Sequence, residues 1–191
     1  MIRFGRLFRV SRMSYRRFAN QEYRNVLQRR VEIPALLRAL PIARGCRLLE
    51  IGCGRGIGLA EFARRCQPGR LVGLDVAPEL IDVARERLAR FGAKAELFVG
   101  DVRQLPFDDR SFDVVVDFGT CYHIDRPDAA LREIARVLDD GGMFVHESPL
   151  AQLIAHPWRT SGRRLPWSAS SELTHDRSAV LWARRRKELV S

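Results

Sequence analysis

The stretch LLEIGCGRGIGLAEFA, residues 48–63, decides the fold of this chain. Its apolar opening indicates a short buried strand, its glycine cluster indicates a tight turn, and Leu59 and Phe62 recur at helical spacing. A second apolar run, LVGLD, follows at residues 71–75, and residues 78–91 form another helical pattern that begins with a proline. Strand and helix therefore alternate from residue 45 onward.

The alternation continues through three more strands. We expect them at residues 95–99 (AELFV), 112–117 (FDVVVD) and 143–147 (MFVHE), with a helix over residues 127–138 between the last two. FDVVVD is rich in β-branched residues and apolar on both faces, which is typical of a central strand in a parallel sheet. Five strands that alternate with helices predict an α/β fold, a doubly wound, Rossmann-like and mostly parallel sheet with helices on both faces.

The ligand site of such a sheet is predicted by its geometry. Ligands bind outside the carboxyl ends of the strands, at the point where the strand order reverses. The residues that follow Ile51, Leu74, Val99 and Val116 are therefore expected to form the site.

The two ends of the chain depart from the alternation. We expect residues 1–44 to form a basic N-terminal arm and covering helices, and residues 45–191 to form the ligand-binding domain. Near the C-terminus, residues 179–186 (AVLWARRR) predict an antiparallel edge strand. Either it forms a compact hairpin with residues near Leu173, or one edge of the sheet is incomplete; an uncovered edge would make a homodimer an alternative to a monomer.

The chain is strongly basic, because 33 Lys and Arg against 23 Asp and Glu give a formal net charge of +10. Such a charge attracts nucleic acid, lipid head groups or acidic small molecules, although a high-GC coding sequence also produces an excess of arginine. Residues 1–17 contain no acid and interleave arginines with apolar residues. This segment is a solvated arm, a surface for peripheral contact with a membrane or an anionic substrate, or an organellar targeting peptide.

Composition also excludes several classes of protein. No apolar run reaches the roughly 18 to 20 residues that cross a bilayer, so we expect no transmembrane segment. The four cysteines lack the paired spacing of a zinc site and the density of a disulfide scaffold, and the scattered histidines lack spaced carboxylates. We therefore expect reduced thiols, no metal site and a cytoplasmic location.

The glycine turn after the first strand carries the first chemical signal. A dinucleotide-binding turn requires G-x-G-x-x-G, and neither Gly52 nor Gly54 as the first glycine gives that spacing. What remains is E-x-G-x-G-x-G, from Glu50 to Gly56. A close backbone approach beside a carboxylate suits a cofactor that has no phosphates and carries a cationic amino group.

Four stretches in order carry a family resemblance. LLEIGCGRGIGLAEFA, VGLDVAPELIDVAR, VGDVRQLPFDDRSFDVVVDFGTCYHI and LREIARVLDDGGMFVHE together resemble the class I S-adenosylmethionine-dependent methyltransferases, especially the group with quinone-biosynthesis and other small-molecule enzymes. The likeness covers residues 20 to 148. It implies that S-adenosylmethionine is the cofactor and that residues 45–191 form a methyltransferase domain that binds it.

The resemblance assigns the ribose and adenine of the cofactor to two strand ends. Asp75 looks like the family's acid that accepts hydrogen bonds from both ribose hydroxyls, with Val76 beside it. Asp101 is similar to the acid that receives the adenine amino group, and Val102 offers its backbone amide to the ring. A helix or turn cap is the alternative role for Asp101.

The methionine end of the cofactor falls to the first and fourth strands. The glycines leave room for the methionine portion, and the main chain after the fourth strand resembles the segment that holds the amino group near the reacting methyl. A structural turn is the alternative for Asp117. The residues expected at this end are Glu50, Gly52, Gly54, Gly56, Asp117 and Phe118.

Methyl transfer from a sulfonium asks little chemistry of the protein beyond an in-line approach of the acceptor and exclusion of water. His123 is the best-placed general base if the acceptor must lose a proton, and otherwise it shapes the pocket. We expect a small, apolar or aromatic acceptor. An RNA or protein methyltransferase is the alternative suggested by charge, but residues 117–120 (DFGT) lack the Asn/Asp-Pro-Pro-aromatic signature; a non-catalytic cofactor-binding module is the third possibility.

Overall fold

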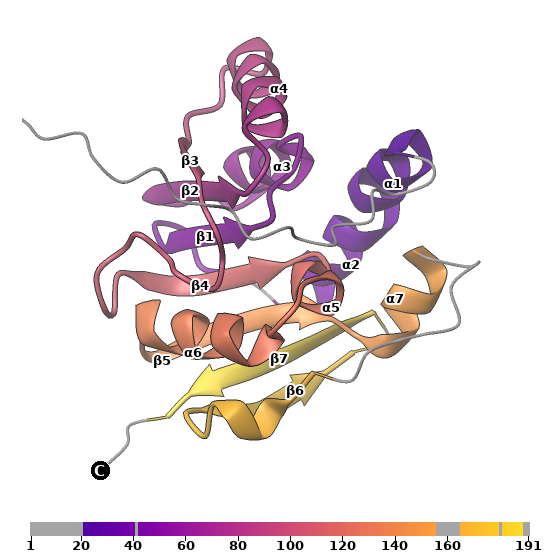
Figure 1. Ribbon diagram of the computed structural model, residues 1–191. Coiled ribbons are helices and arrows are strands. Elements are labelled where there is room, and N and C mark those ends of the chain that lie inside the picture. Colours follow the sequence, from indigo (N-terminus) through magenta and orange to yellow (C-terminus); the bar gives the residue numbers. More distant parts are fainter. Residues whose placement is uncertain (1–20, 41, 156–164, 180, 189–191) are drawn as a thin grey trace, which may run out of the picture.

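The computed structural model describes residues 21–40, 42–155, 165–179 and 181–188. Within these ranges seven strands form one sheet with the order β3-β2-β1-β4-β5-β7-β6 (Figure 1). The strands are β1 (Arg47–Ile51), β2 (Arg70–Asp75), β3 (Glu96–Val99), β4 (Phe112–Asp117), β5 (Leu138–Glu147), β6 (Leu173–Ser178) and β7 (Trp182–Lys187). Strands β1 to β5 are mutually parallel, and β7 runs antiparallel to both of its neighbours.

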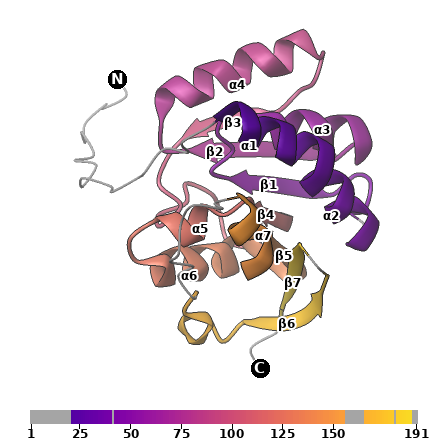
Figure 2. The ribbon, with the colours of Figure 1, turned by 90° about the vertical axis from the view of Figure 1, so that its right-hand side faces the viewer.

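Helices cover both faces of the sheet, as predicted. Figure 2 shows α6 on one side of the strands and α2 and α3 on the other. The helices are α1 (Gln21–Leu27), α2 (Ile33–Ala39), α3 (Ile57–Arg65), α4 (Pro78–Arg90), α5 (Thr120–His123), α6 (Pro127–Val137) and α7 (Pro149–Ala155), with a π-helical turn η1 (Gln28–Glu32) and a 3-10 turn η2 (Trp167–Ala169). The doubly wound, mostly parallel α/β fold is thereby confirmed.

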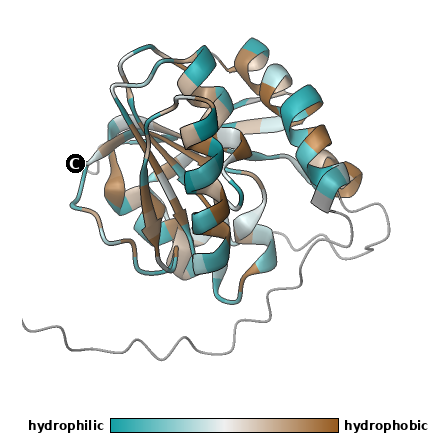
Figure 3. Ribbon diagram, turned by 90° about the horizontal axis from the view of Figure 1, so that it is seen from above, coloured by the Kyte–Doolittle hydropathy of each residue, from teal (hydrophilic) through white to brown (hydrophobic). Residues whose placement is uncertain are grey.

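The core consists of two apolar layers, one on each face of the central strands. Alternate residues of β1 face opposite ways, so Leu49 packs in the layer under α6 while Leu48 packs in the layer under α2 and α3. The strands are mainly hydrophobic and the helices alternate hydrophobic and hydrophilic residues, which is the pattern of a sheet buried on both faces (Figure 3).

The N-terminal helices share this core. Ile33, Leu36 and Leu40 are fully buried in the same layer as Leu48 of β1. The π-helical turn joins α1 to α2 without leaving the helical backbone region, and Pro34, which has no N–H to continue the helical hydrogen bonds, lies just after this turn. The predicted domain boundary after residue 44 stays a prediction, and the expectations for residues 1–17 lie outside the described residues.

The C-terminal hairpin completes the sheet. Of the two alternatives left open by the sequence, the compact hairpin is confirmed: residues near Leu173 form β6, and the AVLWARRR segment supplies β7. The prediction that residues 179–186 form the edge strand is wrong, because β7 pairs with β5 on one side and with β6 on the other, and β6 is the antiparallel edge strand. All four cysteines are buried and unpaired, and none of the described helices is long and apolar enough to span a bilayer.

Candidate functional site

A cavity of 130 Å³ lies at the carboxyl ends of the central strands. Strand β1 has β2 on one side and β4 on the other, so the strand order reverses there and the cavity lies where the topology predicts a ligand site; that it binds a ligand stays a prediction. Of the residues predicted for the site, those that line the cavity are Gly52, Gly54, Asp75, Val76, Asp101, Val102, Phe118 and His123. Glu50, Gly56 and Asp117 do not line it.

The glycine turn between β1 and α3 requires glycine at two of its positions. Gly52 has φ +61°, and a Cβ there would lie 1.9 Å from Oγ1 of Thr120. Gly56 has φ +71°, and a Cβ there would lie 3.0 Å from the Cβ of Ala84 on α4. Left-handed backbone and lack of space both exclude other side chains. At these two positions the turn therefore tolerates no side chain.

Asp75 ends β2 and is 8% exposed. One carboxylate oxygen accepts a hydrogen bond from the Gly54 amide at 2.8 Å, and the other accepts one from the Ala77 amide at 2.9 Å. Burial raises the pKa of Asp75, although these amides act in the opposite direction. Each oxygen keeps a second lone pair, so the side chain is held rigidly and can still accept two hydroxyl donors.

Asp101 occupies the far end of the cavity, after β3. Arg103 binds its carboxylate, with Nη2 at 2.6 Å and Nε at 3.0 Å from Oδ2, and the Arg103 amide donates to Oδ1 at 2.9 Å. Burial alone would raise the pKa of Asp101, but the Arg103 contacts hold it below its ordinary value. The turn-capping role is therefore present, in a residue that also lines the cavity.

Asp117 is fully buried and serves the short helix α5. Its carboxylate accepts the amide of Thr120 at 2.5 Å and that of Cys121 at 3.1 Å, which caps the helix N-terminus. The structural-turn role considered for Asp117 accounts for both carboxylate oxygens. Its neighbour Phe118 lines the cavity, and the α5 helix places Thr120 and His123 along the same wall.

Glu50 is buried beneath the first turn of α3. It is 1% exposed, and a Cβ on Gly58 would lie 2.4 Å from both of its carboxylate oxygens. Neither oxygen has a hydrogen-bond partner among the described residues. Burial raises the pKa of Glu50 well above its ordinary value, while the charge of Arg24 acts in the opposite direction. A buried carboxyl without hydrogen-bond partners is stabilised in its ionised form by a nearby cation. The pocket therefore fits a cofactor that carries positive charge close to β1.

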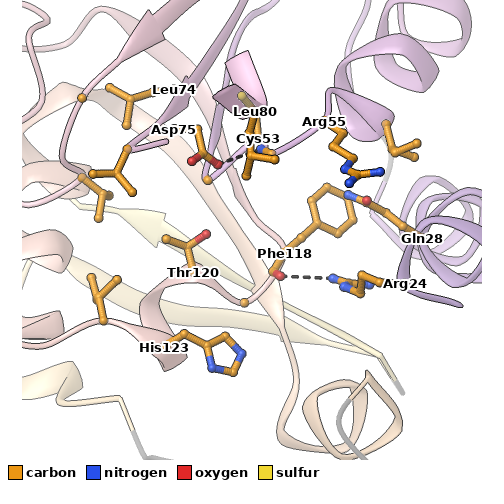
Figure 4. Close-up of a pocket in the computed structure, with 18 of the residues that line it drawn as sticks. Arg24, Gln28, Cys53, Arg55, Leu74, Asp75, Leu80, Phe118, Thr120 and His123 are labelled. Atoms are coloured by element: carbon orange, nitrogen blue, oxygen red, sulfur yellow. Dashed lines mark hydrogen bonds between the residues drawn. The ribbon is translucent and has the colours of Figure 1, made fainter. Parts of the chain in front are cut away.

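The sequence analysis missed the cavity residues contributed by the N-terminal helices. Arg24, Asn25 and Gln28 line the cavity from α1 and η1. Arg24 and Gln28 lie beside Phe118 (Figure 4). Arg24, Gln28 and Glu32 recur every four residues and are all buried. Polar residues at helical spacing normally face solvent. That these three are buried becomes visible only in the folded chain, where their partners on other elements are known.

Arg24 is the centre of a buried ion network. Its guanidinium pairs with Glu32, donates to Glu147 at the end of β5 at 2.7 Å, and donates to the Phe118 carbonyl at 3.1 Å. Gln152 of α7 donates to the second oxygen of Glu147. Burial raises the pKa of Glu147 to about 8, against the opposing effect of Arg24. The network fixes α1 and α7 to the strand ends.

Comparison with known proteins identifies the family of this chain. Residues 49–146 match the family model described as a methyltransferase domain. The chain belongs to this family. The fatty-acid O-methyltransferase of Mycolicibacterium smegmatis is 39% identical over 102 residues, which are 53% of this chain and 36% of that protein. The chain spans about a third to a half of the length of the curated relatives that it matches.

Solved structures support the same placement. Phosphoethanolamine N-methyltransferase 2 from Haemonchus contortus, solved in complex with S-adenosyl-L-methionine, is 30% identical with a TM-score of 0.55 over 60% of this chain and 26% of its own. The PH0226 protein from Pyrococcus horikoshii covers 91% of this chain and 95% of its own, with a TM-score of 0.65. At 21% identity, that likeness establishes the shared fold.

Proposed function

We propose that this chain binds S-adenosylmethionine in the cavity at the strand ends and transfers its methyl group to a small, apolar acceptor. The observation that carries the proposal is that three features meet at the carboxyl ends of β1 and β2, two in the cavity wall and one buried beneath it. Main chain of the glycine turn lines the cavity, the Gly54 and Ala77 amides hold the Asp75 carboxylate in its wall, and Glu50 is a buried carboxyl without a hydrogen-bond partner in the described residues.

The cavity offers a distinct group to each part of this cofactor. Asp101 and Val102 are suited to the adenine, and Asp75 and Val76 to the ribose. At the β1 end, the main chain of the glycine turn and of Phe118 is suited to the methionine portion, and the Glu50 carboxyl favours its positive charge. We assign Arg24, Gln28 and Arg55 to the neighbourhood of the methionine carboxylate, because they line the cavity from α1 and the turn.

Bound S-adenosylmethionine supplies an activated methyl group on a sulfonium, so the protein has to position the acceptor and exclude water. Thr120, His123 and Ile124 of the α5 segment line the remaining wall, and Ile124 is buried. We assign the acceptor to this wall. His123 is proposed as the base for acceptors that lose a proton, with a pocket-shaping role as the alternative.

The nature of the acceptor follows from the wall and from a relative. The fatty-acid O-methyltransferase is named for an acceptor with a long apolar chain, and the cavity here has an apolar component beside a few polar groups. A carboxylate acceptor needs no base, since it attacks in its ionised form. A fatty acid is therefore the first acceptor to assay.

Calorimetric titration with S-adenosylhomocysteine tests the cofactor site. Asp75→Ala removes the acceptor of the ribose hydroxyls and should weaken binding by about 1.5 to 3 kcal/mol, the range for hydrogen bonds to a charged group. Asp82→Ala on α4, whose side chain is 72% exposed, is the matched control and should bind like the wild type. No binding by folded wild-type protein would overturn the proposal.

Transfer of a labelled methyl group to a panel of fatty acids, quinols and sterols then tests the acceptor. Tight cofactor binding without transfer to any small molecule would favour the RNA or protein methyltransferase, or the non-catalytic module. Loss of transfer in Asp75→Ala at a cofactor concentration that saturates the wild type is the expected result.

A further inference from the structure

Exposed apolar side chains gather on α1 and α7, next to the cavity. Five of them form what we call the α1/α7 patch: Tyr23 (44% exposed), Val26 (53%), Leu150 (46%), Leu153 (58%) and Ile154 (39%). The α7 helix contains no charged residue. A group of large apolar residues at the surface marks a site of interaction rather than a solvated face.

The two helices that carry the patch are held together and to the cavity. The Tyr23 hydroxyl reaches the Ile154 carbonyl at 3.5 Å, and Arg24 and Gln152 bind the two oxygens of Glu147. Both helices lie at the carboxyl edge of the sheet (Figures 1 and 2). The α1 helix lines the cavity with Arg24 and carries the patch with its neighbours in sequence. A partner on the patch therefore contacts a helix that also lines the cavity.

Most of the net positive charge of the chain comes from two segments of the sequence, one directly before α1 and one directly after α7. Residues 1–20, which lead into α1, contain six arginines, and residues 156–164, which follow α7, contain three; neither segment contains an acid. They account for nine of the ten net positive charges, because the remaining 24 Lys and Arg nearly balance the 23 Asp and Glu. A coding bias would spread arginine evenly over the chain, so it does not explain this distribution.

An exposed apolar patch on two helices whose flanking sequence is basic favours one class of partner. We propose that the α1/α7 patch binds the surface of an anionic lipid bilayer. Aliphatic and aromatic side chains enter the boundary between head groups and acyl chains, while arginines are attracted to anionic head groups. Nucleic acid would account for the arginines alone, since phosphates offer nothing to exposed leucine and isoleucine.

The position of the patch suggests a function for binding to the bilayer. In this respect the inference rests on the proposed function: an apolar acceptor taken from the bilayer would reach the cavity beside α1 without crossing water. The binding itself can be measured without any methyl transfer. Failure to bind vesicles with normal S-adenosylhomocysteine binding would overturn this inference alone, and the reverse result would overturn the proposed function alone.

Flotation of the full chain with lipid vesicles is the test. We expect the protein to float with mixed phosphatidylcholine and phosphatidylglycerol vesicles, to stay behind with phosphatidylcholine alone, and to be released by high salt. Replacement of Arg159, Arg163 and Arg164 by Gln should lower the partition coefficient about fivefold for each arginine. Absence of flotation with the anionic vesicles would overturn the proposal.

The patch has its own pair of variants. Leu150→Gln with Leu153→Gln removes apolar surface without changing charge, and should lower the partition coefficient on anionic vesicles roughly tenfold. Val83→Gln with Phe91→Gln is the matched control, because these exposed side chains lie on α4, and it should leave flotation unchanged. Calorimetry with S-adenosylhomocysteine should give the same affinity for both variants as for the wild type.

Two outcomes would reassign the surface. Tight binding of RNA, with vesicle flotation insensitive to Leu150→Gln and Leu153→Gln, would identify a polyanion site and overturn the lipid proposal. A dimer in sedimentation velocity that the same pair of substitutions converts to a monomer, with flotation unchanged, would identify the patch as a contact between two copies and would also overturn it.

Discussion

Replacement of Arg24 by methionine tests whether the buried ion network is formed as described. Methionine is similar in length and apolar, so it occupies the space of the side chain and removes the charge and its hydrogen bonds. The guanidinium binds Glu32, Glu147 and the Phe118 carbonyl, and the Arg24 side chain is 9% exposed. The substitution therefore leaves two carboxyls in a buried site without their cation.

The size of the effect follows from burial. The side chains of Glu32 and Glu147 are 3% and 0% exposed, so water does not replace the lost partner. Removal of one member of such a network destabilises a protein by about 3 to 5 kcal/mol, because an uncompensated charge stays buried. A domain of this kind is stable by about 5 to 15 kcal/mol, so the loss is a large share of the total.

The effect should depend on pH with a definite sign. Burial raises the pKa of Glu147 from 4.5 to about 8, so its contribution to stability is full below pH 4.5 and is lost as the pH rises through 8. Arg24 lowers the pKa of Glu147 and of Glu32. Without Arg24 the pKa values of Glu147 and Glu32 rise further. In the variant the ionised carboxylates have no cation beside them, so their ionisation destabilises the folded state more than it does in the wild type. The destabilisation is therefore largest at alkaline pH and shrinks as both carboxyls take up protons.

Urea unfolding of the wild type and of Arg24→Met at about pH 5.5 and about pH 8.5 measures this difference. Arg132→Met is the matched control, since its ion pair with Asp128 is exposed on α6 and its loss should affect stability far less than the loss of Arg24 at either pH. Adding Glu147→Gln to Arg24→Met should restore part of the stability at alkaline pH. A loss below 1 kcal/mol, or one that is equal at both pH values, would refute the buried network.

Two further predictions concern the cavity wall. Gly52→Ala puts a Cβ 1.9 Å from Oγ1 of Thr120 at a φ of +61°, so the turn must shift and the affinity for S-adenosylhomocysteine should fall more than about tenfold by calorimetry, with a smaller effect on the unfolding midpoint. His123→Asn should leave that affinity within about twofold of the wild type. For acceptors that lose a proton it should lower kcat and abolish the rise of kcat with pH that a histidine base imposes, whereas an unchanged pH profile would leave His123 with a pocket-shaping role.

The order of strands and helices was predictable because the spacing of apolar residues distinguishes strands from helices and the turn residues mark where each element ends. The strand at residues 112–117 is β-branched and apolar on both faces, and it lies at the centre of the sheet as β4. The C-terminal hairpin was only one of two alternatives. The chain between Ser148 and Leu173 has no clear periodicity, and the pairing of β7 with β5 and β6 depends on contacts distant in sequence.

The site was predictable where one residue follows one strand. Gly52, Asp75 and Asp101 come together because parallel strands place their carboxyl ends at one edge. Arg24 and Gln28 were not found, since their role depends on docking of α1 against Glu147 and Phe118. Nothing in a local pattern distinguishes a buried polar stripe from a solvated one.

The ion network specifies where α1 docks more than how tightly it is held. Lifting α1 from the sheet would break the contacts of Arg24, but it would also return Glu32 and Glu147 to water, so part of the lost attraction is recovered as hydration. Arg24→Met gives no such recovery, because the two carboxyls stay buried. We therefore expect the substitution to be more harmful than an opening of the α1 cover. The same network can thus place Tyr23 and Val26 beside the cavity mouth and still allow a ligand to pass beneath the helix.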